Sequence, residues 1–246
     1  MGRAPLILLA MSGLLAACHS GAGQRERSYD VAAFPQADRP KSPPAAEDLA
    51  NEATREHAGE ARVMLQQADI RAGMTVADIG AGDGYYTVRL AQQVGPAGRV
   101  LAEDIDDGAL RRLGDRVARE HLDNVSIRHG VDADPKLPAG SFDRIVLAHV
   151  YREVREPYAF LWNLRPALRA GGRVVVVDRD LSTARRGIAP TLLFCEMTAV
   201  GYRLAEYLRM PAVNGYYAEF EVAGNRPAPA DIRPCRDGEK APSKAG

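Results

Sequence analysis

Three glycines at alternate positions follow an acidic residue in one short stretch of the chain. The stretch contains Asp78, Gly80, Ala81, Gly82 and Gly84. The apolar run before the glycines predicts a strand over 75–79, and apolar residues at helical spacing after them predict a helix over 85–94. Glycine lets the backbone turn sharply and come close to a ligand. The pattern therefore predicts a strand, a turn and a helix that form a cofactor pocket.

The glycine spacing excludes two common nucleotide-binding turns. A dinucleotide-binding fingerprint requires its third glycine where this chain has Tyr85. A phosphate-binding P-loop requires a Lys-Ser or Lys-Thr pair after the glycines, and none is present. The pocket is therefore expected to take a different nucleotide-type ligand.

A second acidic position follows about 20 residues downstream, where a ribose-binding carboxylate is expected in a strand-helix-strand unit. Residues 99–104 read as a strand that ends in Asp104. A carboxylate there can accept hydrogen bonds from both ribose hydroxyls, and ionised acceptors form the stronger bonds. Asp106 and Asp107 are interpreted as caps of the next helix.

These features resemble the class I S-adenosylmethionine-dependent methyltransferases, in which an acidic strand residue precedes a Gly-x-Gly-x-Gly turn. The resemblance also covers the loop after a third strand at 124–128, where Asp132 before Ala133 matches the acidic residue that meets the adenine amino group. Asp134 is a rival for that role, and a solvated turn is the other reading. The resemblance implies S-adenosylmethionine as the cofactor, bound by Asp78, Gly80, Ala81, Gly82, Gly84, Asp104, Ile105, Asp132, Ala133 and His149.

The same resemblance implies the fold. A helix over 161–168, a glycine stop at 171–172 and four valines ending at Asp178 predict a central parallel strand. After a helix over 191–200, the segments 202–210 and 216–222 match the closing antiparallel hairpin of the methyltransferase sheet. We therefore expect a Rossmann-like α/β fold with a seven-stranded, mostly parallel sheet and helices on both faces. The resemblance is clear over 73–178 and weaker to residue 222.

Candidates for the acceptor side follow the strand at 145–148, because ligands of open α/β sheets lie beyond the carboxyl ends of the strands. They are His149, Tyr151 and Arg152. His149 could act as a base near neutral pH, although a packing role is the commoner one for such a histidine. Related chains often have a His-His pair at the position of Arg152-Glu153. The substrates of those chains are therefore not inferred for this one. A helix over 47–68 is expected to cover the cofactor, with Arg55 or His57 near the site.

Composition favours one globular domain and argues against nucleic acid as a partner. The chain has 246 residues, with 32 basic and 32 acidic side chains and a formal net charge of zero. The Asn-Pro-Pro-Tyr signature of DNA amino-group methylation is absent, and no cysteine or histidine cluster has zinc spacing. A small-molecule or lipid-linked acceptor remains by elimination. Nothing in the sequence indicates an oligomeric state.

The first eighteen residues resemble a bacterial lipoprotein signal peptide. A basic start and a short apolar stretch lead to Leu15-Ala-Ala-Cys18, which resembles a lipobox cut before Cys18, the cysteine that would be lipidated. The rival reading is a buried N-terminal helix. Residues 19–45 are then expected to be a flexible tether, 46–224 the methyltransferase domain and 225–246 a mostly disordered tail. Cys195 and Cys235 could pair or remain free thiols.

The lipobox predicts a domain that is anchored to a membrane through a lipid and faces the periplasm. Such a location conflicts with the cytoplasmic supply of S-adenosylmethionine. A true start downstream would keep the enzyme in the cytoplasm, and a donor outside the cytoplasm would also resolve the conflict. The alternative to an enzyme is a membrane-tethered, non-catalytic binding protein on a methyltransferase scaffold.

Overall fold

The protein is built on one seven-stranded sheet, described here from a computed structural model that covers residues 29–43 and 52–236. The strand order is β3-β2-β1-β4-β5-β7-β6. Strands β3, β2, β1, β4 and β5 are parallel, and β7 runs antiparallel between β5 and β6. The strands are β1 (Thr75–Ile79), β2 (Arg99–Asp104), β3 (Val125–His129), β4 (Phe142–Ala148), β5 (Leu168–Arg179), β6 (Tyr202–Met210) and β7 (Gly215–Val222). The predicted sheet and its closing hairpin are confirmed.

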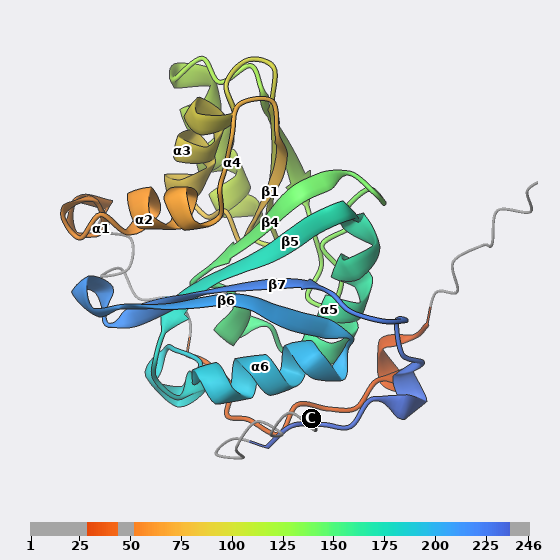
Figure 1. The fold of residues 1–246 in the computed structure, drawn as a ribbon. Coiled ribbons are helices and arrows are strands. Elements are labelled where there is room, and N and C mark those ends of the chain that lie inside the picture. The colour runs from red at the N-terminus through yellow and green to blue at the C-terminus, as the bar shows by residue number, and fades with distance from the viewer. Residues whose placement is uncertain (1–28, 44–51, 237–246) are drawn as a thin grey trace, which may run out of the picture.

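Helices cover both faces of the sheet (Figure 1). One face packs against α2 and α3, with α4 beside β2 and β3, and the other face packs against α5 and α6. The helices are α1 (Glu52–His57), α2 (Glu60–Gln67), α3 (Tyr85–Val94), α4 (Asp107–Arg119), α5 (Pro157–Leu164) and α6 (Pro190–Ala199). The expected cap of α4 is present, since the Asp106 carboxylate accepts a hydrogen bond from the Ala109 N–H at 2.6 Å.

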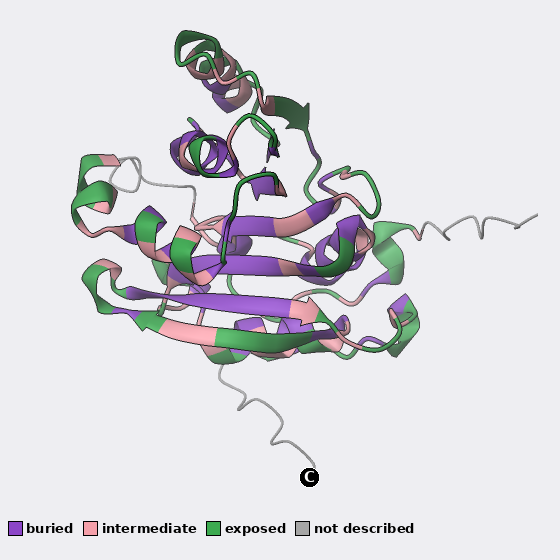
Figure 2. Cartoon of the chain, turned by 45° about the horizontal axis from the view of Figure 1, so that its top comes forward, coloured by how far each residue is buried: buried purple, intermediate pink, exposed green. Residues whose placement is uncertain are grey.

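The four consecutive valines of β5 form the centre of the core. Val174 and Val176 pack into the cluster under α5 and α6, whereas Val175 and Val177 pack into the cluster under α2 and α3. A strand that is covered on both faces needs apolar side chains at every position, and this is why the run does not alternate. Figure 2 shows the central strands buried and much of the edge strand β6 exposed.

Two elements differ from the sequence-based expectation. The helix expected over 47–68 is divided, because Gly59 takes a left-handed conformation with φ of 66° between α1 and α2. The helix expected to reach Leu168 ends at Leu164, and β5 already begins at Leu168. The glycine pair therefore lies within β5, where the register shifts and Gly171 has φ of 75°.

Residues 29–43 fold onto the domain, so the expectation of a flexible tether is wrong for this segment. Phe34 is buried, and its ring meets Trp162 edge to face at 5.7 Å between centroids. Tyr29 packs on the same indole at 5.3 Å. The composition of the segment is polar and rich in proline, which does not indicate burial. These few aromatic contacts nevertheless bury enough surface to hold it on the domain. Cys18 and the rest of 1–28 lie outside the described residues.

Residues 225–236 also pack on the domain, so the expectation of a disordered tail is wrong as far as Arg236. The Trp162 indole N–H donates a hydrogen bond to the Pro227 carbonyl at 2.8 Å. Cys195 of α6 and Cys235 form a disulfide, which decides between the two readings of this pair. Asp38 forms a parallel bridge with Arg236, and the two terminal segments run side by side past α6 (Figure 1). Within 29–43 and 52–236, no helix is long and apolar enough to cross a membrane.

Candidate active site

A cavity of about 750 Å³ lies at the carboxyl ends of β1, β2 and β4. Parallel strands bring these ends to one edge of the sheet, which is the expected position for a ligand. Of the residues predicted for the site, the cavity lining includes Gly80, Ala81, Gly82, Asp104, Ile105, Asp132, His149 and Arg152. Asp78, Gly84, Ala133 and Tyr151 do not line it.

The glycine turn has the conformation that its sequence requires. Gly80, Gly82 and Gly84 have φ of 67°, 55° and 85°, which favour glycine over any other residue. A Cβ on Gly80 would lie 2.3 Å from a methyl carbon of Val150, so the turn also packs closely against the segment after β4. This packing fixes the floor of the cavity.

Asp78 supports the turn from below rather than facing the cavity. Its buried carboxylate accepts a hydrogen bond from the Thr87 hydroxyl at 2.6 Å, which ties β1 to α3. Burial raises the pKa of Asp78 to about 6, although the Thr87 hydrogen bond opposes this rise. Gly84 is the N-cap of α3, where a Cβ would lie 2.6 Å from Leu113. Both residues therefore shape the turn.

Asp104 lines the cavity at the end of β2, as predicted. Its Oδ2 accepts a hydrogen bond from the Gly82 N–H at 2.8 Å, and its Oδ1 accepts one from the Asp106 N–H at 2.9 Å. These bonds fix the carboxylate against the glycine turn. Each carboxylate oxygen can accept a further hydrogen bond, so both ribose hydroxyls of a nucleoside could be held there.

Glu103 is a buried carboxyl of the cavity lining that the sequence analysis missed. It lies next to Asp104, and burial raises its pKa to about 8, with the Asp104 charge adding to the rise. A Cβ on Gly130 would lie 1.5 Å from the Glu103 carboxylate, so glycine at that position makes room for this side chain. An acidic residue directly after the apolar run 100–102 was the available signal.

The loop after β3 distinguishes the two adenine candidates. Asp132 lines the cavity, whereas the Asp134 carboxylate turns back to the Lys136 N–H at 2.8 Å. Ala133 is buried, and its carbonyl accepts a hydrogen bond from the Asn163 side chain. Ile105 is 52% exposed although it is apolar, and it offers a surface for a flat ring. The geometry favours Asp132 and Ile105 for the adenosine end of a ligand.

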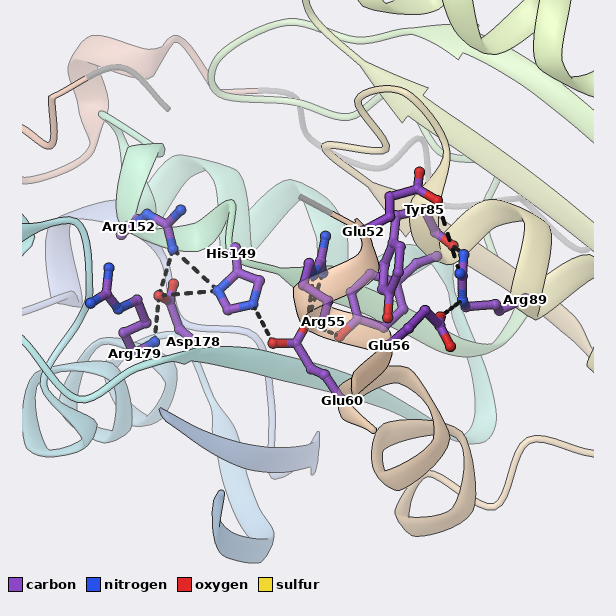
Figure 3. A network of polar contacts seen from close by, with 11 residues as sticks. Glu52, Arg55, Glu56, Glu60, Tyr85, Arg89, His149, Arg152, Asp178 and Arg179 are labelled. Carbon is purple, nitrogen blue, oxygen red and sulfur yellow. Dashed lines mark hydrogen bonds and ion pairs between the residues drawn. The ribbon is translucent and has the colours of Figure 1, made fainter. Parts of the chain in front are cut away.

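His149 lies between two carboxylates at the end of β4 (Figure 3). Its Nε2 is 3.0 Å from Glu60 of α2, and its Nδ1 is 3.9 Å from Asp178 of β5. Arg152 approaches the same Nδ1 at 3.4 Å but is itself neutralised by Asp178 at 2.7 Å. Burial alone would lower the pKa of His149, but the contacts with Asp178 and Glu60 outweigh it and raise this pKa. The surroundings of the ring therefore stabilise its charged form more than water does.

The histidine also has an unusual backbone. Its φ is 59°, a left-handed conformation that is costly for a residue other than glycine, by about 1–2 kcal/mol. Such strain persists only where the surroundings hold it, and it is commonest at functional sites. Here the Glu60 contact and the hydrogen bond from the His149 N–H to the Val177 carbonyl hold the ring at the cavity.

Tyr151 and Arg152 differ in their placement. Arg152 lines the cavity, and a buried ion pair with Asp178 holds its guanidinium in place. The Tyr151 hydroxyl is fully buried and donates to Glu196 of α6 at 2.7 Å, so Tyr151 belongs to the core and is not an acceptor-side residue. That correction follows from the 3-10 turn Tyr151–Glu153, which directs neighbouring side chains to different sides.

The N-terminal helices cover one side of the cavity. Arg55 lines the cavity and stacks over Tyr85 at 3.9 Å, whereas His57 is exposed and is not part of the lining. Arg55 also pairs with Glu60 at 2.7 Å, and the Tyr86 hydroxyl donates to Glu60 at 2.8 Å. Glu60 therefore joins α1, α3 and β4. Burial alone would raise the pKa of Glu60, but His149 and Arg55 outweigh it and lower this pKa to about 2.

Comparisons with known proteins agree with this geometry. Residues 76–172 match the family model of the methyltransferase domain. Nocamycin O-methyltransferase of Saccharothrix syringae is 41% identical over 83 residues, which are 34% of this chain and 30% of that protein. The ubiquinone/menaquinone biosynthesis C-methyltransferase UbiE of Marinomonas sp. is 33% identical over 119 residues, which are 48% of this chain and 47% of that protein. The chain thus spans less than half the length of these curated relatives.

A solved structure extends the fold match beyond that segment. The SAM-dependent methyltransferase of Aquifex aeolicus superposes with a TM-score of 0.64 at 21% identity, over 69% of this chain and 93% of that one. Residues 76–172, which match the family model, include the glycine turn and Asp104 of the cavity. Residues 76–172 of this chain are thus a methyltransferase domain, and the chain has the fold of the S-adenosylmethionine-dependent methyltransferases. Its cofactor is S-adenosylmethionine.

The residues of the methyltransferase domain fit this cofactor. The Asp104 carboxylate could hold the ribose and Asp132 and Ile105 the adenine, and the glycine turn would let the backbone approach the methionine part. Carboxylates that line the cavity also suit a ligand with a positively charged sulfonium. The cavity volume of about 750 Å³ lies within the usual range of cofactor sites.

Substitution of Asp104 tests the ribose assignment. Asp104→Ala is expected to weaken S-adenosylmethionine binding by more than about 1.5 kcal/mol, or more than about tenfold in Kd, because a charge-assisted hydrogen bond is lost. Isothermal titration calorimetry measures this. Asp107→Ala is the matched control, since the Asp107 side chain is 76% exposed in the first turn of α4 and does not line the cavity. Unchanged affinity in Asp104→Ala would remove this residue from the site.

The charged form of His149 predicts a pH dependence of stability. The folded-state pKa lies above the ordinary value of 6.5, so this contribution is complete below that value and is lost as the pH rises through the folded-state pKa. We expect the free energy of unfolding of the wild type, relative to His149→Gln, to fall between about pH 6 and about pH 9. Urea denaturation at both pH values measures it. A difference that does not change with pH would contradict a charged His149.

Proposed function

We propose that the chain transfers a methyl group from S-adenosylmethionine to a small-molecule or lipid-linked acceptor. The observation that carries this proposal is the cavity in which the Asp104 carboxylate is hydrogen-bonded to the glycine turn, with His149 and Arg152 on its acceptor side. The sequence relatives support methyl transfer as the class of reaction, and they differ among themselves in the atom that is methylated. The acceptor atom is therefore left open.

The chemistry required of the protein is mainly alignment. S-adenosylmethionine supplies a methyl group activated by the positive charge on sulfur. Transfer forms a bond from the acceptor's nucleophilic atom to the methyl carbon and breaks the carbon–sulfur bond, whose electron pair stays on sulfur. Any proton on the acceptor leaves to a base or to water. Holding the two reactants in line accounts for a large part of the rate in such displacements.

His149 and Arg152 suit a positioning role in this reaction. Each side chain already has a buried partner, since the His149 imidazole contacts Glu60 and the Arg152 guanidinium pairs with Asp178. A side chain fixed by buried partners presents one surface to a ligand and does not have to be ordered when the ligand binds. The general-base role considered for His149 from the sequence is disfavoured, because its Nε2 and Nδ1 already face Glu60 and Asp178.

Direct binding measurements test the proposal. We expect the full chain to bind S-adenosylmethionine and S-adenosylhomocysteine with micromolar Kd in calorimetry, and NADH not at all, because the third glycine of a dinucleotide turn is replaced by Tyr85. NADH is the control for non-specific nucleotide binding. A well-folded chain that binds neither sulfur nucleotide would overturn the enzyme and favour the non-catalytic binding protein considered above.

We also propose that the domain works outside the cytoplasm, held to the membrane by a lipid on Cys18. Two independent features support this location: the Leu15-Ala-Ala-Cys18 segment and the Cys195–Cys235 disulfide. Disulfides persist in oxidising compartments and are rare in the cytoplasm. This location requires that the methyl donor reach the cell envelope.

Cell fractionation tests the location. The wild type is expected in the membrane fraction, and Cys18→Ser, which cannot be lipidated, is expected to leave it. In the protein from intact cells, maleimide labelling should find Cys195 and Cys235 blocked until a reductant is added. Cys195→Ser is the control for labelling, because it leaves Cys235 free. Recovery in the cytoplasm with two reactive thiols would contradict the proposal.

A further inference from the structure

A second cavity, of about 530 Å³, opens beside the cofactor cavity. One of its walls is the N-terminal segment at 36–42, and the opposite wall is the connection between β4 and α5 at 152–156. Asp132, Arg152, Glu153 and Val154 line both cavities, so the two lie side by side. We call the second one the outer cavity.

The outer cavity adjoins the cofactor cavity on its acceptor side. Of the residues assigned to the cofactor, Gly80, Gly82 and Asp104 line the first cavity alone, whereas Asp132 lines both cavities. The shared residues Arg152 and Glu153 follow the end of β4, next to His149. A molecule in the outer cavity would therefore approach the cofactor from the side of His149 and Arg152, away from the ribose.

Arg39 fixes the N-terminal wall to the domain. Its side chain is 4% exposed, and its Nη2 donates a hydrogen bond to the Val154 carbonyl at 2.8 Å. Its Nε lies 3.5 Å from the buried Glu196 carboxylate, and its guanidinium stacks on the Tyr151 ring at 5.2 Å. The Thr183 hydroxyl donates to the Pro40 carbonyl at 2.7 Å. Residues 36–42 are thus held to the domain by specific contacts.

The lining of the outer cavity is highly charged. It presents Lys41 and Arg155 together with Asp132, Glu153 and Glu156, whereas Arg39 and Arg152 are buried in their ion pairs with Glu196 and Asp178. Its apolar members are small: Ala37, Pro40 and Val154. Among the described residues of the lining, none has an aromatic or long aliphatic side chain, so these residues offer an isoprenoid or acyl chain almost no apolar surface to bury. Charges of both signs offer partners to a molecule that carries charged groups of its own.

We propose that the outer cavity is the acceptor-binding site, that residues 36–42 form its outer wall, and that it takes a small, water-soluble, charged acceptor. This inference rests on the proposed methyl transfer and narrows its acceptor, since it disfavours a lipid-linked one. The N-terminal segment thereby acquires a role in substrate selection. A volume of about 530 Å³ is enough for a molecule of metabolite size.

Label transfer from S-adenosylmethionine with a tritiated methyl group tests the acceptor class. The full, oxidised chain is incubated with the aqueous phase of a bacterial metabolite extract, and separately with its chloroform-soluble phase and with a prenylated hydroquinone in detergent. We expect label in products of the aqueous phase alone. Label in the chloroform-soluble products or in the hydroquinone, or label in none of the three while S-adenosylmethionine still binds, would overturn the proposal.

A variant that fills the outer cavity tests its location. Ala37→Trp places an indole at the N-terminal wall and is expected to reduce labelling at least about tenfold while the Kd for S-adenosylmethionine stays within about twofold. Ala32→Trp is the matched control, because Ala32 is exposed in the 3-10 turn Val31–Ala33 of the same segment and does not line the cavity. Equal labelling by both variants would overturn the location.

Hydrogen exchange gives a readout that does not depend on turnover. With S-adenosylhomocysteine bound, the aqueous fraction that accepts label is expected to slow amide exchange at 36–42 in the wild type and not in Ala37→Trp. Unchanged exchange in the wild type would count against a bound acceptor at this wall. If the wild type did not bind S-adenosylmethionine at all, the proposed function itself would be refuted. Failure of the acceptor site and failure of the proposed function are therefore distinguishable.

Discussion

The parallel register of β1 with β2 and β4 is the constraint on which the site depends. Ile79 pairs with Glu103 on one side and with Leu147 on the other, so the three strands end at the same level of the sheet. Gly80 therefore begins its turn beside Asp104 and Ala148, the last residues of β2 and β4, and the Gly82 N–H can reach the Asp104 carboxylate. A shift of one residue in any of these strands would turn its side chains to the opposite face and separate these groups.

Buried charge is the second organising feature, and it explains why the N-terminal helices have one position. Glu60, His149, Arg152 and Asp178 are largely removed from water, and each is balanced by another member of the group. Breaking one buried pair leaves an uncompensated charge and typically costs about 3–5 kcal/mol. Helix α2 cannot move from the sheet without separating Glu60 from His149. The electrostatics of the acceptor side and the position of the helices that cover the cofactor are thus linked.

The sequence predicts the sheet well because its signals are local. The valine run of β5, the glycine turn and the apolar spacing of α3 are each set by neighbouring residues, and the structure places their boundaries within a few residues. The partners inside the site are not local: Glu60 and His149 are 89 residues apart, and nothing near either residue indicates the other. Glu103 and Tyr151 show a different limit. Glu103 faces the cavity and Tyr151 faces the core because of strand and turn geometry. The type of residue alone does not show which way a side chain points.

Composition fails for the two terminal segments for a specific physical reason. It counts the apolar surface that a segment carries, whereas order depends on the surface that the segment can cover on a folded domain. Phe34 and Tyr29 enclose Trp162 from one side, and Arg226 stacks on the same indole at 3.4 Å. The Cys195–Cys235 disulfide holds the C-terminal segment to α6, next to the Asp38–Arg236 bridge. Arg39, one residue further along, reaches Glu196, the neighbour of Cys195 in the chain. The disulfide and the Arg39 ion pair therefore support the wall of the outer cavity from adjoining positions of α6, so the segments that composition would assign to linkers stabilise the acceptor side.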